Sequence, residues 1–394
     1  MNHAPEASSQ SMPGIADQGA FSRGMSTVGW GLYCASSWTW CIGIFLPIIM
    51  LGLFGGGGYW VFAVPNVIGC AAFGYVLTRE RSQAMVAAHA PAIRWFSFVT
   101  IIFQIFFLSW ATERFIIDDA QWPAVIWPVL GAVLTWTACA GAISLRSDLF
   151  WRWIAVIAAV AAVILFIMLV GYTGGIRFNP RPEDAPSLLA SAPIIILGFL
   201  LNPYLDATFH RARQNTPSKH AFAIFGLAFA FMLAFSAASF NAQTLLPYLL
   251  PVVFVQWTIQ LVFTIGAHLR EVRDLPHRRI GATLVCFSAV LIGAGLGIPG
   301  LAREEVYLSI LGLYALPFPM YMVAAIANGL SRPLPLRSIM AIIVLSGLLS
   351  PLGWLGFVEN QTLALAPAFI GVLFGGIVIG KIARNSSGPV ASTG

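Results

Sequence analysis

Leu197-Gly-Phe-Leu-Leu-Asn-Pro-Tyr-Leu-Asp-Ala-Thr-Phe-His-Arg-Ala212 is an apolar segment interrupted by an Asn-Pro pair and a carboxylate. Pro203 has no backbone N–H to donate, and its ring clashes with the preceding helical turn. Asn202, directly before it, is disfavoured in helical geometry. The segment 187–210 therefore predicts a membrane-spanning helix that stops near its middle and restarts as a short, charged half-helix.

A second interruption lies near the start of the chain, in Cys34-Ala-Ser-Ser-Trp-Thr-Trp-Cys-Ile-Gly43, which Pro47 follows. Its hydroxyl side chains stand in a stretch that is otherwise apolar. Counting the apolar segments places the two interruptions five spans apart, so the two spans run in opposite directions. Breaks at corresponding positions of two inverted halves are the best sequence indication of a transporter binding site.

Composition supports a membrane protein. Of the 394 residues 58% are hydrophobic and only 9% are charged, and the mean hydropathy is +0.83, whereas soluble domains have about 25% charged residues. This excludes a soluble enzyme, a disordered chain and a nucleic-acid-binding module. Runs of about 20 apolar residues predict twelve spans: 28–53, 59–78, 93–112, 122–144, 151–172, 187–210, 219–240, 245–268, 280–298, 306–328, 338–357 and 362–382.

The expected organisation is an all-α polytopic membrane protein of about 12 transmembrane helices. We expect a cytoplasmic tail (1–27), a first inverted repeat of spans 1–5 (28–172), a second repeat of spans 6–10 (187–328), two additional spans (338–382) and a disordered tail (385–394). The expected partners are the lipid bilayer and a small-molecule substrate, with no nucleic acid. The oligomeric state stays open.

Charge asymmetry predicts the orientation. Seventeen of the 21 Lys and Arg residues fall in segments that are cytoplasmic if the N-terminus is inside. The other four lie in the alternate loops: Arg114, Arg177, Arg181 and Arg303. Because cytoplasmic loops are enriched in Lys and Arg, both termini are predicted to be cytoplasmic.

Catalytic signatures are missing from the sequence. It contains no H-E-x-x-H motif, nucleophile elbow, phosphate-binding loop or paired-carboxylate motif, so an enzyme is not expected, and neither is a cofactor other than a bound Na⁺. The five cysteines are expected to pack within spans, and the six histidines to lie in or beside cytoplasmic segments. Asp206 is the one carboxylate well inside an apolar span, which makes it a functional candidate.

The two interrupted segments resemble those of the sodium/solute symporter family, in which the sixth core helix has an LGYFGQPH element followed by R-F-x-A. The matching or similar positions are Leu197, Gly198, Phe199, Asn202, Pro203 and Phe209, with Ala35–Trp38, Leu46-Pro47, Gln260-Leu-Val and Arg270-Glu271 elsewhere. The resemblance implies the five-plus-five inverted-repeat fold, called LeuT-type, of the APC superfamily. It also implies a secondary transporter that works by alternating access in the plasma (inner) membrane.

The same resemblance bears on the coupling ion. Family members bind sodium between carbonyls of span 1 and a Ser-Thr or Ser-Ser pair on span 8, but an ungapped match places Val255 and Gln256 there. Gln256, Thr258 and Thr264, with Ser36 or Ser37, could supply a rearranged set of oxygens. Asp206 could instead carry a proton, pair with Arg211 or Arg213, or cap the half-helix. The candidates for coupling to sodium or protons are therefore Ser37, Gln256, Thr258 and Asp206.

The breaks also supply the expected substrate contacts: Ser36, Ser37, Trp38, Trp40, Phe199, Asn202 and Tyr204, with Gly198, Pro203, Gly43 and Pro47 as helix-breaking residues. These side chains suggest a small organic solute held between aromatic walls. The alternative is a non-transporting membrane sensor or structural protein that retains the fold. The Val255-Gln256 departure favours this alternative, whereas the Asn202-Pro203 break favours a transporter.

Overall fold

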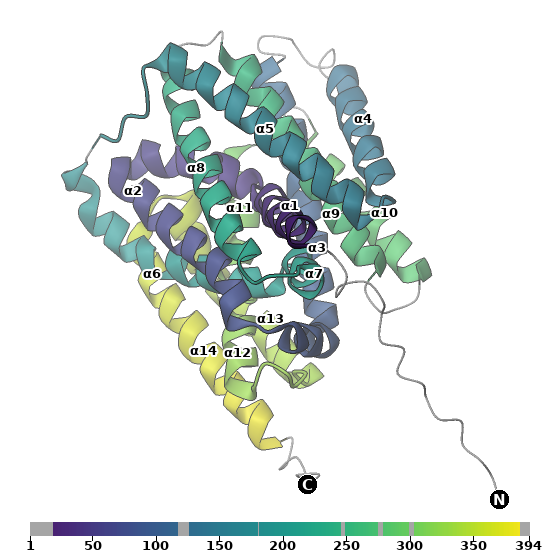
Figure 1. Ribbon diagram of the computed structural model, residues 1–394. Helices are drawn as coiled ribbons and strands as arrows, with labels where there is room; N and C mark the ends of the chain where they lie inside the picture. The colour runs from purple at the N-terminus through teal and green to yellow at the C-terminus, as the bar shows by residue number, and fades with distance from the viewer. Residues whose placement is uncertain are drawn as a thin grey trace, which may run out of the picture.

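The computed structural model describes residues 19–116, 126–179, 181–245, 249–274, 279–298 and 303–386, and within these ranges every regular element is a helix (Figure 1). Residues 1–18 of the predicted N-terminal tail (1–27) and 387–394 of the predicted C-terminal tail (385–394) lie outside the described residues, and residues 20–27 belong to the first helix instead. The prediction of an all-α polytopic membrane protein is confirmed.

The helices follow one another along the chain with short connections. In order they are α1 (Ala20–Trp38), α2 (Cys41–Val76), α3 (Arg79–Ile116), α4 (Ile126–Ser144), α5 (Asp148–Thr173), η1 (Pro182–Asp184), α6 (Ala185–Leu201), η2 (Asn202–Leu205), α7 (Ala207–Asn215), α8 (Ala221–Leu245), α9 (Leu250–Asp274), α10 (Arg279–Leu296), α11 (Glu304–Ala315), α12 (Pro317–Asn328), α13 (Leu336–Gly353), η4 (Trp354–Val358), η5 (Thr362–Ala364) and α14 (Leu365–Ser386).

Ten helical segments among the described residues are long and apolar enough to cross a membrane. The predicted span 28–53 is not one of them because it is divided between α1 and α2. The predicted span 280–298 contributes only a shorter apolar stretch, Val285–Leu296. On α5 the exposed residues Ile157, Val160, Ile164 and Ile167 recur at helical spacing, as expected of a face that contacts lipid.

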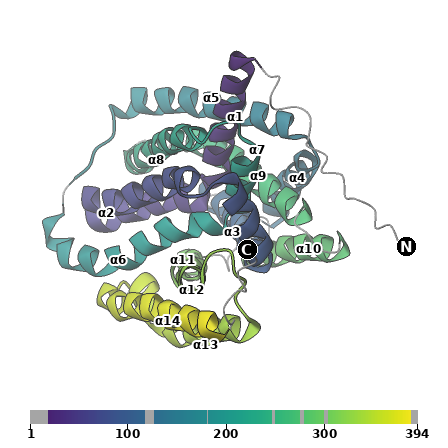
Figure 2. The same ribbon diagram turned by 60° about the horizontal axis from the view of Figure 1, so that its bottom comes forward.

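The broken helices lie in the middle of the bundle. Helix α1 packs against α5, α7, α8 and α9, while α2 packs against α6 and α8, and α3 against α9 and α10. Helices α13 and α14 lie at the edge of the bundle beside α12 and α6, and α5 lies at the opposite edge (Figure 2). The two C-terminal helices thus pack on the outside of the bundle, beside α12 and α6.

The structure contains both expected interruptions, but of the predicted helix-breaking residues only Pro203 lies in one: Gly43 and Pro47 lie inside α2, and Gly198 lies inside α6. Helix α1 ends at Trp38, and Thr39 and Trp40 connect it to α2 with non-helical backbone angles. Helix α6 ends at Leu201, the short helix η2 follows, and Asp206 in extended conformation precedes α7.

A third interruption was not predicted, because the segment 306–328 reads as one span. Leu316 separates α11 from α12 with φ −109° and ψ −77°. Pro317 follows it, lacks the N–H that would continue the helix, and restricts the backbone of the preceding residue. The prolines in this span (Pro317 and Pro319) therefore indicate in the sequence where the helix breaks.

Glycine allows the turn that joins the first two spans. Gly55 adopts φ +61°, a conformation that favours glycine. A Cβ atom on Gly55 would lie 2.1 Å from the carbonyl oxygen of Asn179, and that oxygen accepts a hydrogen bond of 2.9 Å from Gly56 N. The turn between these spans thus depends on the close approach of the segment that follows α5.

We expect Gly55→Ala to lower the free energy of unfolding by about 1–3 kcal/mol, because a left-handed backbone becomes strained and the Asn179 contact is displaced. The matched control is Gly52→Ala in the same helix, where a Cβ would lie 3.8 Å from the Phe240 ring. Thermal unfolding in detergent measures both. Equal melting temperatures for the two variants would contradict this account of the turn.

Candidate functional site

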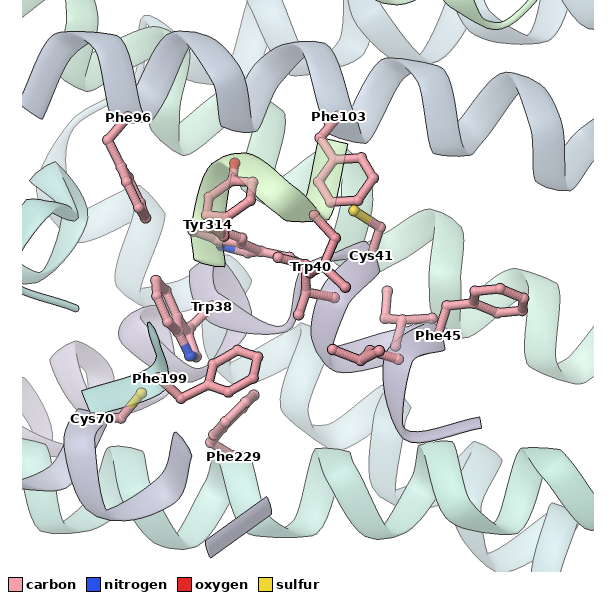
Figure 3. Packing of buried hydrophobic residues seen from close by; sticks show 14 of the residues in the cluster. Trp38, Trp40, Cys41, Phe45, Cys70, Phe96, Phe103, Phe199, Phe229 and Tyr314 are labelled. Carbon is pink, nitrogen blue, oxygen red and sulfur yellow. The ribbon is translucent and has the colours of Figure 1, made fainter. Parts of the chain in front are cut away.

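A small pocket lies where the interrupted helices meet. Its walls are mostly aromatic and amide side chains, and none of them is charged: Trp38, Trp40, Ile42, Gly43, Asn66, Phe199, Asn202 and Tyr314. Figure 3 shows the rings of Trp38 and Phe199 on one side of the α1–α2 connection and those of Trp40 and Tyr314 on the other. The pocket has room for about one water molecule, so side chains must move to admit an organic solute.

The two tryptophans of the first break are held in defined positions. Their ring centroids are 4.4 Å apart, and Trp40 also packs edge-on against Tyr314 at 5.4 Å. The indole N–H of Trp38 donates to Asn66 Oδ1 at 2.8 Å, and that of Trp40 donates to the carbonyl of Ser37. Because both indole N–H groups have partners within the protein, these rings offer mainly their apolar faces to the pocket.

Polar groups in the pocket can both donate and accept hydrogen bonds. Asn202 Nδ2 donates to the carbonyl of Tyr314 at 2.8 Å, while its buried Oδ1 has no partner. Ile42 and Gly43 lie at the start of α2, before its first helical hydrogen bond, from Ile44 N to Trp40 O. The first N–H groups of a helix have no intrahelical acceptor, and Ile42 and Gly43 line the pocket together with Asn202.

The pocket contains some of the predicted substrate contacts. Trp38, Trp40, Phe199 and Asn202 line it; Ser36, Ser37 and Tyr204 do not. Ser37 Oγ instead bonds to Thr208 at 2.9 Å.

Asn66 and Tyr314 line the pocket but were not predicted. Asn66 lies in the second span and Tyr314 just before the third break, so neither residue is near the two interruptions in sequence. The proline pair in span 10 was the one available signal for Tyr314.

A second, apolar space adjoins the pocket and shares Phe199, Asn202 and Tyr314 with it. Its other walls are Leu46, Ile194, Ile195, Gly198, Leu311, Ala315 and Phe357. These residues come from α2, α6, α11 and the segment after α13. Of the two helices that the first break separates, the space is therefore lined by α2 and not by α1.

Asp206 and His268 face each other beside the same break. Asp206 Oδ1 accepts hydrogen bonds from Thr208 N at 2.7 Å and Thr208 Oγ1 at 2.6 Å, so Asp206 caps the N-terminus of α7. Its other oxygen, Oδ2, lies 3.6 Å from His268 Nε2. Both side chains are 0% exposed, and neither atom has a hydrogen-bond partner. Asp206 contacts neither Arg211 nor Arg213, so of its proposed structural roles only the helix cap is present.

Of the predicted ion-coupling residues, Ser37 and Asp206 are joined through the Thr208 hydroxyl, whereas no hydrogen bond joins Gln256 or Thr258 to them. Val255 is 48% exposed, Gln256 contacts the Met232 sulfur at 3.6 Å, and the buried hydroxyl of Thr258 has no partner. Instead Thr264, two helical turns further along α9, reaches the break: its hydroxyl is 3.3 Å from the carbonyl oxygens of Ser36 and Ser37. It also bonds to the Gln260 carbonyl at 2.9 Å.

Three of the histidines expected in or beside cytoplasmic segments are fully enclosed by other helices. His89, His210 and His268 are buried in the bundle. His268 Nδ1 bonds to Ser97 of α3 at 3.0 Å, and His210 Nδ1 bonds to Ser82 at 2.9 Å. The sequence placed His268 at the end of a span, and only the packing of α9 against α1 and α3 shows that this end is interior.

A cluster of charged residues ties α5, α7 and α9 together on the α1 and α7 side of the breaks, and a tyrosine of α1 adjoins it. Arg211 of α7 bonds to Glu271 and, at 2.5 Å, to Asp274, both of α9. Arg211 Nη1 also lies 3.5 Å from Oδ1 of Asp148, the first residue of α5. Arg270 contacts the same carboxylate oxygen. The hydroxyl of Tyr33 in α1 is 3.5 Å from Glu271. We call Arg211, Glu271, Asp274, Asp148 and Arg270 the ionic cluster.

Comparisons with known proteins show the fold. No protein-family model and no curated protein matches the sequence. A solved structure described as a substrate-bound, outward-open state of a Na⁺-coupled sialic acid symporter with a novel Na⁺ site is similar, with 13% sequence identity and a TM-score of 0.55. The match covers 93% of this chain and 90% of the symporter chain. The chain therefore has a sodium symporter-like transporter fold.

Proposed function

We propose that this protein is a secondary active transporter of a small, uncharged organic solute, driven by a cation gradient through alternating access in a LeuT-type core. The observation that carries the proposal is the pocket formed where two helix breaks meet. Interrupted helices leave backbone donors and acceptors free at mid-membrane, which is how many transporters bind their substrates. The fold shared with a Na⁺-coupled symporter supports this reading.

The chemistry of the pocket favours a flat solute with amide-like groups. The aromatic faces of Trp38, Trp40 and Tyr314 suit a planar body. Asn202 Oδ1 can accept from an N–H group of the solute, while the N–H groups at the start of α2 can donate to a carbonyl. Since no charged side chain lines the pocket, a charged solute would lose hydration without gaining an ion pair.

The two sides of the breaks differ in a way that suits alternating access. On the α1 and α7 side, the ionic cluster holds α5, α7 and α9 together. On the α2, α6 and α11 side, an apolar space continues from the pocket. We therefore propose that the ionic cluster is a gate, closed in this conformation, and that by the charge asymmetry of the loops it faces the cytoplasm.

The alternative function, a non-transporting sensor that retains the fold, is favoured by one observation. The pocket is small enough that no organic solute enters it as it stands. Solute exchange separates the two functions: a transporter in proteoliposomes exchanges internal for external radiolabelled solute, whereas a sensor binds it without exchange.

We expect uracil, a flat and uncharged cyclic amide, to raise the melting temperature of the protein in detergent, because a ligand of the folded state stabilises it. Orotate, which is uracil with a carboxylate, should give no shift. Asn202→Ala should abolish the uracil shift, whereas the control Asn215→Ala, at the exposed end of α7, should preserve it. A shift with orotate but none with uracil would contradict the proposed substrate class.

Arg211→Ala should open the proposed gate. In a variant that keeps Cys34 as its single cysteine, the Cys34 thiol should react with N-ethylmaleimide about tenfold faster. Loss of the partly buried ion pairs lets α1 move away from α7 and α9, so that the reagent reaches Cys34. Cys34 is buried beside Tyr33, which contacts the cluster. The matched control is Arg213→Ala, since Arg213 lies on the same helix but bonds to the Leu77 carbonyl outside the cluster. Equal labelling rates in both variants would show that the cluster is not a gate.

A further inference from the structure

We propose that the coupling ion is a proton, bound between Asp206 Oδ2 and His268 Nε2. This inference rests on the proposed transport function and specifies its driving ion. On binding, an O–H bond forms between the Asp206 carboxylate and a proton delivered by water. On release the same bond breaks, and water takes the proton. No redox step is involved.

The geometry leaves one oxygen and one nitrogen for this role. Asp206 Oδ1 is fully used by two short hydrogen bonds from Thr208. The imidazole of His268 is oriented by the bond between its Nδ1 and Ser97. This leaves Oδ2 and Nε2 facing each other at 3.6 Å, buried and without other partners.

The separation of these two atoms fits a pair that gains and loses a proton. A hydrogen bond between nitrogen and oxygen spans about 2.7–3.2 Å, so the observed 3.6 Å leaves the pair open by a few tenths of an ångström. A proton on either atom gives the other one a donor to accept from. Because an unpaired buried polar atom is costly, the pair is drawn together when one proton lies between them and separates when that proton leaves.

The surroundings favour a proton over sodium. Hard cations take oxygen ligands, commonly six or more for Ca²⁺. His268 offers a nitrogen here, which suits a proton better than sodium. The carbonyl oxygens of Ser36 and Ser37, which could bind sodium, are already approached by the Thr264 hydroxyl. Ile265 follows Thr264 and supplies no second hydroxyl.

The titratable neighbours of the pair are few. Cys34 of α1, Cys70 of α2, Tyr314 of α11 and Glu271 of α9 interact electrostatically with Asp206, and of these Glu271 is bound to Arg211. On the other side of His268 lie the Trp40 ring, at 5.8 Å between centroids, and the uncharged Ser97. Within the described residues, no Lys or Arg forms an ion pair with Asp206.

Protonation here would act on the helix breaks. Asp206 caps α7, and Thr208, which Asp206 holds, bonds to Ser37 at the end of α1. His268 connects the pair to α3 through Ser97. A change of charge between Asp206 and His268 therefore acts directly on the hydrogen bonds that hold α1 and α7. It also acts on the bond between α9 and α3.

Infrared difference spectroscopy of the purified protein tests this inference without a substrate. As the pH rises from about 5 to 9, the carbonyl band of a protonated carboxyl should disappear in the wild type, with the same midpoint in NaCl and KCl. Asp206→Asn should lack the band, and the control Glu305→Gln, on the exposed start of α11, should retain it. His268→Leu should move the midpoint downward by about one pH unit, since the protonated carboxyl loses the Nε2 atom that accepts its O–H.

Three results would overturn the inference: a band that survives in Asp206→Asn, a midpoint unchanged in His268→Leu, or a sodium-specific loss of the band. Should Asp206→Asn fail to fold, the His268→Leu midpoint and the comparison of NaCl with KCl still test the proton site. Failure here is distinguishable from failure of the transport proposal. If uracil binds and exchanges but sodium removes the band, the protein is a transporter coupled to sodium. If the band titrates but no solute exchanges, the protein has a proton site and does not transport.

Discussion

The structure depends on satisfying the backbone groups that are released where helices stop inside an apolar bundle. In a membrane interior these groups find no water, so each must be bonded within the protein or line a cavity. The breaks after Trp38, after Leu201 and at Leu316 are grouped together, and side chains from neighbouring helices bond their backbone groups. Tyr307 donates to the Cys41 carbonyl at 3.0 Å, Ser236 to Gly43 at 2.9 Å and Asn202 to Tyr314 at 2.8 Å.

This requirement explains why the pocket is at the breaks. The polar groups that remain without protein partners there, such as Asn202 Oδ1, are available to a solute or an ion. It also explains why several buried polar residues lie on helices that are otherwise apolar. Gln104 of α3, for example, accepts from Cys41 N at 3.2 Å, at the point where α2 begins.

Local chemistry made part of this predictable from the sequence. The Asn-Pro pair and the hydroxyl-rich stretch before Trp40 marked two of the breaks, and Asp206 was singled out because a carboxylate is costly inside an apolar span. The contacts of Asp206 could not be predicted in the same way. His268 lies 62 positions further along the chain, and only the packing of α9 against α1 places its ring beside the break.

Register was the second limit. An ungapped match to span 8 pointed to Val255 and Gln256, and Thr264 was named only as one member of a rearranged set. Of these residues the structure brings Thr264 to the end of α1. Helical periodicity identifies which residues share a face, but it does not fix how far one helix is shifted along another. Asn66 and Tyr314 were not predicted for the same reason, since each reaches the pocket from a helix that packs there only in the folded bundle.

The ionic cluster and the apolar space lie on opposite sides of the breaks, and the proposed alternating access requires that they open in turn. Spin labels at Gly24→Cys on α1 and Leu145→Cys after α4, in a protein whose native cysteines are replaced by alanine, report the distance across the cluster side by pulsed electron paramagnetic resonance. We predict two distance populations, with the longer one enriched by Arg211→Ala. A single distance, unchanged by that substitution and by uracil, would contradict alternating access.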